Sequence, residues 1–227
     1  MGGGLLGARL SAERGGTAMS WLARLDIDAG DARAEGITDN YAWHKRVWEC
    51  FPYIQDSKRD FLTRIDQLER GFRVWVMARQ KPVHPKWCPP GAFALKEIAP
   101  SFWSHREYAF DLRANPTKRL SNRAVEGTSP GPGKRIPLTK PDDLRDWLRR
   151  KAAASGFAVR EDKPLEIGPM VESHFRKAGH SAYHGGVQFR GILEVTDREK
   201  FSMAYHAGIG SAKSFGFGLL LLAPVIE

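Results

Sequence analysis

The sequence predicts an α+β fold of two tandem ferredoxin-like (RRM-like) domains, each with the element order βαββαβ. Both halves of the chain alternate short apolar, strand-like runs with stretches of helical periodicity, and the pattern is clearer in the second half. Five of the 14 prolines lie between residues 81 and 105, which is typical of a loop-rich junction. A chain of 227 residues that is 42% hydrophobic can supply two small cores. We therefore expect domains over residues 19–100 and 106–227.

The first 18 residues are rich in glycine and lack the long apolar core of a signal peptide. We expect residues 1–18 to be a disordered extension or the result of a start codon assigned too early. Met19 then precedes the apolar run WLARLDI, which predicts the first strand.

A helix over Asn40–Phe51 is predicted by Asp39, a good N-cap residue, and by Pro52, which ends it. Five of its side chains recur at spacings of three and four and share one face: Tyr41, His44, Val47, Trp48 and Phe51. His44 lies at the solvent end of that face. A single histidine beside an apolar face is either structural or, because it titrates near neutral pH, a general acid or base.

Two strands, Phe61–Leu68 and Phe72–Ala78, follow this helix and are joined across Arg70-Gly71. The second half opens with a strand over Tyr108–Ala114 and a turn at Asn115-Pro116.

The segment from residue 113 to residue 135 has one negative residue, Glu126, and six positive residues: Arg113, Lys118, Arg119, Arg123, Lys134 and Arg135. Glycines and prolines interrupt it, so we expect a basic hairpin or loop rather than a helix. This segment is either a solvated charged loop or a surface that contacts phosphate groups.

A capping box from Thr139 to Asp142 predicts the start of a helix that continues to Ala154 and ends before Gly156. Cations line the side away from the core and the last turn: Arg145, Arg149, Arg150 and Lys151. The remaining elements are predicted as strands at 157–160, 165–167 and 187–195, a helix at 197–207 and a last strand at 218–223.

Three histidines, His174, His180 and His184, are expected in a variable surface loop between strands. Their spacing lacks the closely paired ligands of zinc sites, and no cysteine accompanies them. We therefore predict no metal site.

The segment HAGIGSAKSFGFGLLLLAP (206–224) surrounds Lys213 and Ser214 with four glycines: Gly208, Gly210, Gly216 and Gly218. Glycine permits positive φ and close approach of the backbone to a ligand, so N–H groups can face phosphate oxygens. The segment is neither a Walker A loop, because Ala212 stands where a glycine is needed, nor a dinucleotide-binding fingerprint. It is either a tight helix-to-strand connection or a loop that holds a nucleic-acid phosphate.

A formal net charge of +9 and an isoelectric point near 9.7 indicate a polyanionic partner. No stretch approaches the roughly 20 apolar residues of a membrane span, so nucleic acid is favoured over a membrane. The two cysteines, Cys50 and Cys88, lie in unrelated contexts, which argues for a reducing compartment rather than a disulfide scaffold.

In order along the chain, seven segments resemble the CRISPR repeat-processing endoribonucleases of the CasE family, the crRNA-generating subunits of type I-E Cascade: WLARLDI, NYAWHKRVWECFP, FDLRANPTKRL, GKRIPL, DWLRRK, FRGILEVTD and GIGSAKSFGFGLLLLAP. The resemblance extends from Met19 to Pro224 and implies a tandem ferredoxin-like fold without metal or other cofactor. It also implies two partners, the CRISPR repeat RNA hairpin and the other Cascade subunits. The resemblance and the cysteine pattern together lead us to expect a cytoplasmic protein with no membrane partner.

In that family the 2′-OH before the scissile bond attacks the adjacent phosphate, which leaves 2′,3′-cyclic phosphate and 5′-OH ends. The family's Tyr-x-x-His pattern matches Tyr41 and His44 here, so the resemblance makes them the candidate catalytic residues. Some members carry a basic residue five positions after the histidine; Glu49 stands there, so we expect Lys45 or Arg46 to substitute. The other candidate RNA-binding residues are Arg113, Lys118, Arg119, Lys134, Arg135, Arg149, Arg150, Lys151, Lys213 and Ser214.

Cleavage through the 2′-OH needs a base for that hydroxyl, an acid for the 5′-oxygen and cations for the phosphorane. His44 can serve as either base or acid. We expect the product to stay bound, which makes turnover slow. Two alternatives remain: a non-catalytic RNA-binding scaffold subunit, and a general basic nucleic-acid-binding protein.

Overall fold

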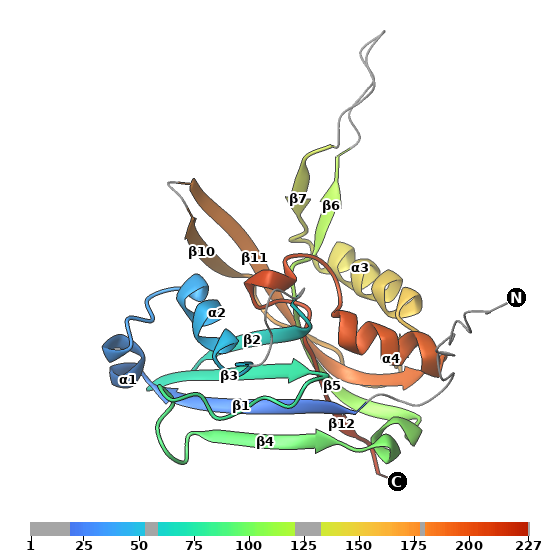
Figure 1. Cartoon of the computed structure of the whole chain (residues 1–227). Coiled ribbons are helices and arrows are strands. Elements are labelled where there is room, and N and C mark those ends of the chain that lie inside the picture. The colour runs from blue at the N-terminus through green and yellow to red at the C-terminus, as the bar shows by residue number, and fades with distance from the viewer. Residues whose placement is uncertain (1–18, 53–58, 121–132, 178–179, 227) are drawn as a thin grey trace, which may run out of the picture.

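The computed structural model describes residues 19–52, 59–120, 133–177 and 180–226. They form two antiparallel sheets, one from each half of the chain, and a separate two-stranded hairpin (Figure 1). Within these residues no helix is both long and apolar enough to cross a membrane. The extension expected over residues 1–18 lies outside the described residues, as does the tip of the basic segment with Arg123 and Glu126.

The first sheet contains four antiparallel strands in the order β2-β3-β1-β4: β1 (Ser20–Asp28), β2 (Phe61–Gln67), β3 (Gly71–Ala78) and β4 (Phe93–Ile98). Two helices lie between β1 and β2: α1 (Ala29–Ala34) and α2 (Asn40–Trp48). Leu25 of β1 lies opposite Val74 of β3, and both are fully buried. Trp43 and Val47 of α2 pack into the same core, so α2 is fixed to this sheet by its apolar face.

The start of α2 is confirmed, and its end is earlier than predicted. The Asp39 side chain accepts a hydrogen bond from the backbone N–H of Ala42 at 2.8 Å. The helix ends at Trp48 because the N–H groups of Cys50 and Phe51 bond to carbonyls three residues back, which tightens the last turn.

One expectation for the first half is wrong. Residues 79–92 contain no helix, so the second helix of the expected βαββαβ order is absent between β3 and β4. The prolines of this stretch have no N–H to donate, which opposes a helix. The closing strand of that order is present as β4, which lies within the expected loop-rich junction and pairs with β1 at the edge of the sheet. Its mixed sequence FALKEI is largely exposed and therefore lacks a strong strand pattern.

The second sheet has the order β10-β11-β5-β12, and β8 and β9 also pair with β11. Its strands are β5 (Glu107–Ala114), β8 (Phe157–Val159), β9 (Glu166–Ile167), β10 (Val171–Lys177), β11 (His180–Val195) and β12 (Leu220–Pro224). The other elements are the 3-10 turns η1 (Pro100–Ser104) and η2 (Lys213–Phe215), the hairpin strands β6 (Thr117–Arg119) and β7 (Arg135–Pro137), and the helices α3 (Pro141–Ala154) and α4 (Arg198–Ala207). The predicted basic hairpin is thus present as β6–β7.

Two further expectations are corrected in this half. Lys140, not Thr139, is the N-cap of α3 and makes no side-chain capping bond; Pro141 at the first helical position starts the helix instead. The backbones of His174, His180 and His184 lie on the β10–β11 hairpin rather than in a loop. This hairpin and β6–β7 project from the same side of the molecule, above α2 and α3 (Figure 1).

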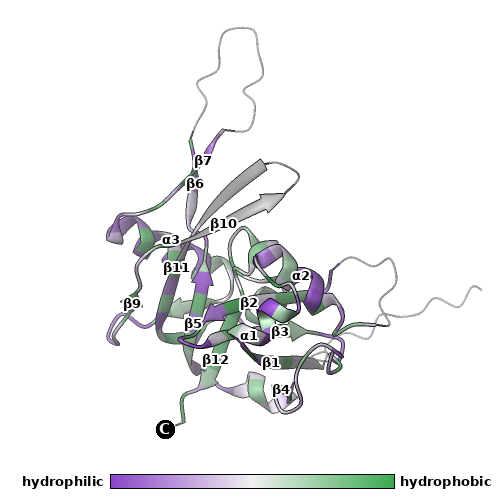
Figure 2. Cartoon of the chain, turned by 90° about the vertical axis from the view of Figure 1, so that its left-hand side faces the viewer, coloured by the Kyte–Doolittle hydropathy of each residue, from purple (hydrophilic) through white to green (hydrophobic). Residues whose placement is uncertain are grey.

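The two halves share a continuous interface. Leu62, Met77 and Ile98 of the first sheet belong to the large core cluster that is otherwise built from the second half. Figure 2 shows green strands running through the middle of the molecule, where this core lies, and purple segments on α2. The η2 turn of the glycine-rich segment contacts both α2 and β2, which fixes α2 relative to that segment.

Candidate functional site

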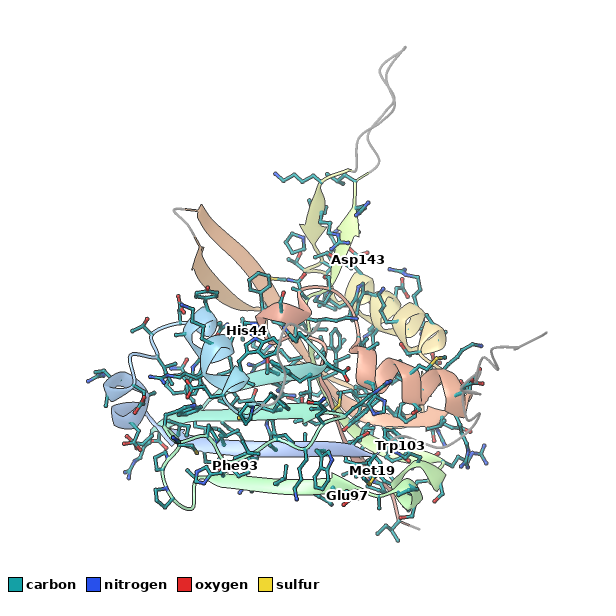
Figure 3. The ribbon with its side chains drawn as sticks, in the orientation of Figure 1. Met19, His44, Phe93, Glu97, Trp103 and Asp143 are labelled. Carbon is teal, nitrogen blue, oxygen red and sulfur yellow. The ribbon has the colours of Figure 1, made fainter. Side chains whose placement is uncertain are left out.

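His44 lies half-buried on α2, on the side that faces the second half of the chain (Figure 3). The indole N–H of Trp48 donates a hydrogen bond to His44 Nε2 at 3.2 Å, and the ring centroid of Phe61 is 6.1 Å from the His44 ring. The other nitrogen, Nδ1, is buried and has no hydrogen-bond partner among the described residues. A buried polar atom without a partner is uncommon and distinguishes His44 from an ordinary core histidine.

The neutral form of His44 is favoured. Burial lowers its pKa below the usual 6.5, and the positive charge of Arg59 lowers the pKa further. Because the indole N–H occupies the lone pair of Nε2, the proton of the neutral ring belongs on Nδ1. At neutral pH the ring is therefore a base, with Nε2 as the accepting atom.

Arg59 was not selected from the sequence. It lies two residues before the start of β2, and its half-buried guanidinium donates from Nε to the Phe61 carbonyl at 2.8 Å. From Nη2 it donates to the Lys213 carbonyl at 2.9 Å, across the boundary between the halves. No local sequence signal indicates this placement, because it depends on a contact between segments that are distant in the chain.

The glycine-rich segment makes the tight helix-to-strand connection that was one of its two interpretations. All four of its glycines have positive φ: Gly208, Gly210, Gly216 and Gly218. A Cβ at Gly218 would lie 2.7 Å from the Ile209 carbonyl oxygen, and one at Gly208 would lie 2.9 Å from Leu62. The connection also presents Ser214 at the surface and the partly exposed Lys213, so it remains available for phosphate contact.

A basic groove lies beside this connection. A cavity of about 660 Å³ is lined by Thr117, Arg135, Lys213, Ser214 and neighbouring residues. A smaller adjoining cavity of about 230 Å³ shares Arg135 and adds Arg119, Trp147 and Lys151. No acidic side chain lines either cavity among the described residues. We call the joint surface of Arg119, Arg135, Lys151 and Lys213 the basic groove.

The cations of the groove influence each other. Partial burial lowers the pKa of Lys213, and the positive charge of Lys151 lowers it further. These four cations come from β6, β7, α3 and the glycine-rich segment, so folding brings together residues that the sequence separates. A groove lined by uncompensated cations favours a polyanion.

Three of the predicted RNA-binding cations are held in ion pairs instead. Arg46 pairs with Glu35 at 2.7 Å and with Glu49 at 3.0 Å. Arg149 pairs with Asp146 at 3.2 Å and Glu161 at 2.9 Å on the outer face of α3.

The third, Arg113, donates from Nη1 to the Ile65 carbonyl at 2.7 Å and pairs with Asp66 at 3.1 Å. Its side chain is largely buried between the halves. The structure therefore places Arg113 in the interface, away from the basic groove.

The remaining candidates are at the surface. Tyr41 is 45% exposed, and Lys45 Nζ lies 4.7 Å from the centre of its ring. Tyr41 shares the helix face of His44, but the two side chains make neither a hydrogen bond nor a ring contact with each other. Three more exposed cations lie on or beside the hairpin and α3: Lys118, Lys134 and Arg150.

The comparisons with known proteins all identify the same family. The family described as "CRISPR associated protein" matches residues 20–224. The chain belongs to this family. The CRISPR system Cascade subunit CasE of Escherichia coli (strain K12) is 31% identical over 191 residues, which cover 82% of this chain and 93% of that protein.

A second sequence relative and a solved structure extend the comparison. The CRISPR-associated endoribonuclease Cse3 of Thermus thermophilus is 28% identical over 222 residues, covering 90% of this chain and all of that protein. A solved structure of Thermus thermophilus Cse3, bound to an RNA that represents a pre-cleavage complex, aligns with a TM-score of 0.70 at 26% identity. That alignment covers 91% of this chain and 100% of the other. This CRISPR-associated chain therefore shares their mixed α/β fold with antiparallel sheets.

Proposed function

We propose that this protein is an endoribonuclease that cleaves precursor crRNA at the repeat hairpin without a metal ion and then stays bound to the product within Cascade. The observation that carries the proposal is the position of a neutral, half-buried His44 on the helix that contacts the edge of the basic groove. The named activity and the RNA complex of its relatives support the proposal.

In the proposed mechanism His44 is the base. The ribose 2′-OH replaces the Trp48 indole on Nε2 and transfers its proton there as the 2′-oxygen attacks the adjacent phosphate. A bond forms between the 2′-oxygen and phosphorus, and the bond between phosphorus and the 5′-oxygen breaks. The leaving 5′-oxygen takes up a proton from water, which gives a 2′,3′-cyclic phosphate and a 5′-OH, and His44 then returns its proton to the solvent. These steps require only proton transfer and stabilisation of negative charge.

Tyr41 is proposed to help orient the ribose, because it is exposed one turn before His44 on the same helix. The basic groove is proposed to hold the hairpin stem. Stems of RNA are recognised largely through A-form shape and backbone, which suits a groove of converging cations. Lys118, Lys134 and Arg150 would extend this surface.

We also propose the finer architecture: two tandem ferredoxin-like units over residues 19–100 and 106–227. The strand orders β2-β3-β1-β4 and, through β8 and β9, β8/β9-β11-β5-β12 support it. The first unit lacks the second helix, as described above. A cytoplasmic location follows from the proposed role in Cascade.

The test is cleavage of the host's own CRISPR repeat hairpin in EDTA, with wild-type protein, His44→Ala and a hairpin carrying one 2′-deoxy nucleotide before the cut. We expect wild type to cut the RNA, and both changes to abolish cutting while binding persists. Cutting by His44→Ala at the wild-type rate contradicts the mechanism.

A non-catalytic scaffold is the second candidate, favoured by one observation: neither nitrogen of His44 is free, because Nε2 holds the indole and Nδ1 is buried. Tight binding of the hairpin without cleavage by wild type supports that candidate. Binding that ignores the hairpin sequence supports a general nucleic-acid-binding protein instead.

A further inference from the structure

Arg59 carries a positive charge that no described carboxylate neutralises. Its two hydrogen bonds go to the carbonyls of Phe61 and Lys213, and neither acceptor bears a charge. Burial lowers its pKa, so the charge is partly withdrawn from water as well. A half-buried cation without a carboxylate partner is costly to keep, which indicates a site that an anion completes.

The two carbonyls hold the guanidinium in one orientation. They occupy Nε and one Nη2 proton, and the remaining Nη protons have no acceptor among the described residues. An arginine fixed in this way presents a planar, pre-oriented edge, which is the geometry that binds phosphate oxygens in pairs.

Arg59 and His44 share one neighbour, the Phe61 ring. The Arg59 Cζ atom lies 5.2 Å from its centroid, and the centroid of the His44 ring lies 6.1 Å from it. The positive charge of Arg59 also contributes to the lowered pKa of His44, after burial. The hydrogen bond from Arg59 to the Lys213 carbonyl places Arg59 next to the basic groove, because Lys213 lines that groove.

The other cations near His44 are less suited to the same task. Arg46 is neutralised by Glu35 and Glu49. Lys45 is exposed and lies over the ring of Tyr41. Sequence reasoning expected one of these two to replace the basic residue missing at Glu49, and the structure offers a third cation for that role.

We propose that Arg59 binds the scissile phosphate beside His44 and stabilises the negative charge that develops on its non-bridging oxygens. This inference rests on the proposed endoribonuclease function. Arg59 keeps all its protons throughout: the bond from the 2′-oxygen to phosphorus forms, the bond to the 5′-oxygen breaks, and the guanidinium only donates hydrogen bonds. Lys213 positions Arg59 through its backbone carbonyl.

The test compares Arg59→Gln and Arg59→Lys with wild type in single-turnover cleavage of the repeat hairpin. Arg70→Gln is the matched control, because it removes one exposed positive charge from the same half of the protein at the turn between β2 and β3. Binding is measured with the 2′-deoxy hairpin, which cannot be cut. The pKa of His44 is measured by NMR in each variant.

We expect Arg59→Gln to slow cleavage by about 100-fold or more, as loss of an oxyanion-binding donor does. Its affinity for the 2′-deoxy hairpin should fall less than about tenfold, since it is one phosphate contact of several. Arg59→Lys should be faster than Arg59→Gln, Arg70→Gln should match wild type, and the pKa of His44 should rise in Arg59→Gln because a neighbouring positive charge is gone.

Three results overturn the inference: Arg59→Gln cleaving at the wild-type rate, Arg59→Lys being as slow as Arg59→Gln although both are folded, or an unchanged His44 pKa in folded Arg59→Gln. Failure of the proposed function looks different, because then wild type itself does not cut, or His44→Ala cuts as fast as wild type. A purely structural role for Arg59 would lower the melting temperature and the hairpin affinity together with the rate.

Discussion

Arg64 of β2 donates a hydrogen bond from Nη1 to Oδ1 of Asp111 of β5 at 2.6 Å, and this ion pair joins the two sheets. The Arg64 side chain is only 3% exposed and also pairs with Asp66. Asp111 is further bound by Gln188 and Arg190, and the cations hold its pKa below the usual value against the opposing effect of burial. The interface between the halves is therefore both apolar and charged.

Substituting Arg64 should destabilise the whole protein. Arg64→Ala leaves Asp111 partly buried with fewer partners, and we expect a loss of about 3 kcal/mol, at the lower end for a broken buried pair because Arg190 remains. Urea unfolding measures the change. The control is Arg106→Ala, which removes an exposed ion pair with Glu194 and should cost less than about 1 kcal/mol. Equal costs for the two variants would show that burial does not strengthen the Arg64 pair.

The groove should dominate the salt dependence of RNA binding. Arg135→Gln and Lys151→Gln should each weaken binding of the 2′-deoxy hairpin and reduce the slope of log affinity against log salt by about 1. Arg149→Gln is the matched control on α3, since its charge is already paired with Asp146 and Glu161. Filter binding at several salt concentrations gives the slopes. A larger effect of Arg149→Gln than of the two groove substitutions would indicate that RNA binds the outer face of α3.

Cleavage should depend on pH through the neutral form of His44. Burial and the charge of Arg59 lower the pKa of His44 below 6.5, so the neutral base predominates at pH 7 and is lost as the pH falls through that lowered value. We expect the single-turnover rate to be constant from neutral pH upward. Below neutral pH the rate should fall with the slope that protonation of a single group gives. A rate that rises on acidification would assign His44 the role of acid.

His206 should make the protein less stable at low pH. Its Nε2 lies 2.5 Å from Ser20 Oγ of β1, and its Nδ1 donates to the Ser202 carbonyl at 2.7 Å. Burial lowers its pKa, so below pH 6.5 the unfolded chain binds more protons than the folded chain and stability falls. His206→Gln should be less stable at pH 7 but show a shallower decline between pH 7 and 5. Chemical unfolding at each pH measures this, and parallel declines would exclude His206 as a cause.

Gly218 should be less tolerant of a side chain than a glycine of similar φ in open space. Gly218→Ala combines positive φ with a contact of 2.7 Å to the Ile209 carbonyl oxygen, so we expect a cost above about 2 kcal/mol. Gly36→Ala also has positive φ but no heavy atom within 4 Å, so only backbone strain of about 1 kcal/mol applies. Thermal unfolding of the two variants should show a larger decrease for Gly218→Ala.

Local features were the ones that sequence could predict. The Asp39 cap and the apolar face of α2 depend on residues within one helix, and both are present. By contrast, β4 is an exposed edge strand whose pairing with β1 has little pattern of its own. Which cations are paired depends on partners that are distant in the sequence. Arg113 forms an ion pair with Asp66 across the interface, and Arg59 donates a hydrogen bond to the Lys213 carbonyl. Charge alone could not distinguish groove residues from paired ones.

The pairing of β12 with β5 has a consequence for synthesis. A ribosome delivers β5 long before β12, so the edge of β5 stays open until Leu220–Pro224 has emerged. The glycine-rich connection directly precedes β12 and is fixed only when that strand docks, through bonds such as Gly218 N–H to the Arg113 carbonyl. The Lys213 carbonyl that anchors Arg59 is thus placed only after β12 has docked. A nascent chain should therefore not cleave RNA before β12 has left the ribosome.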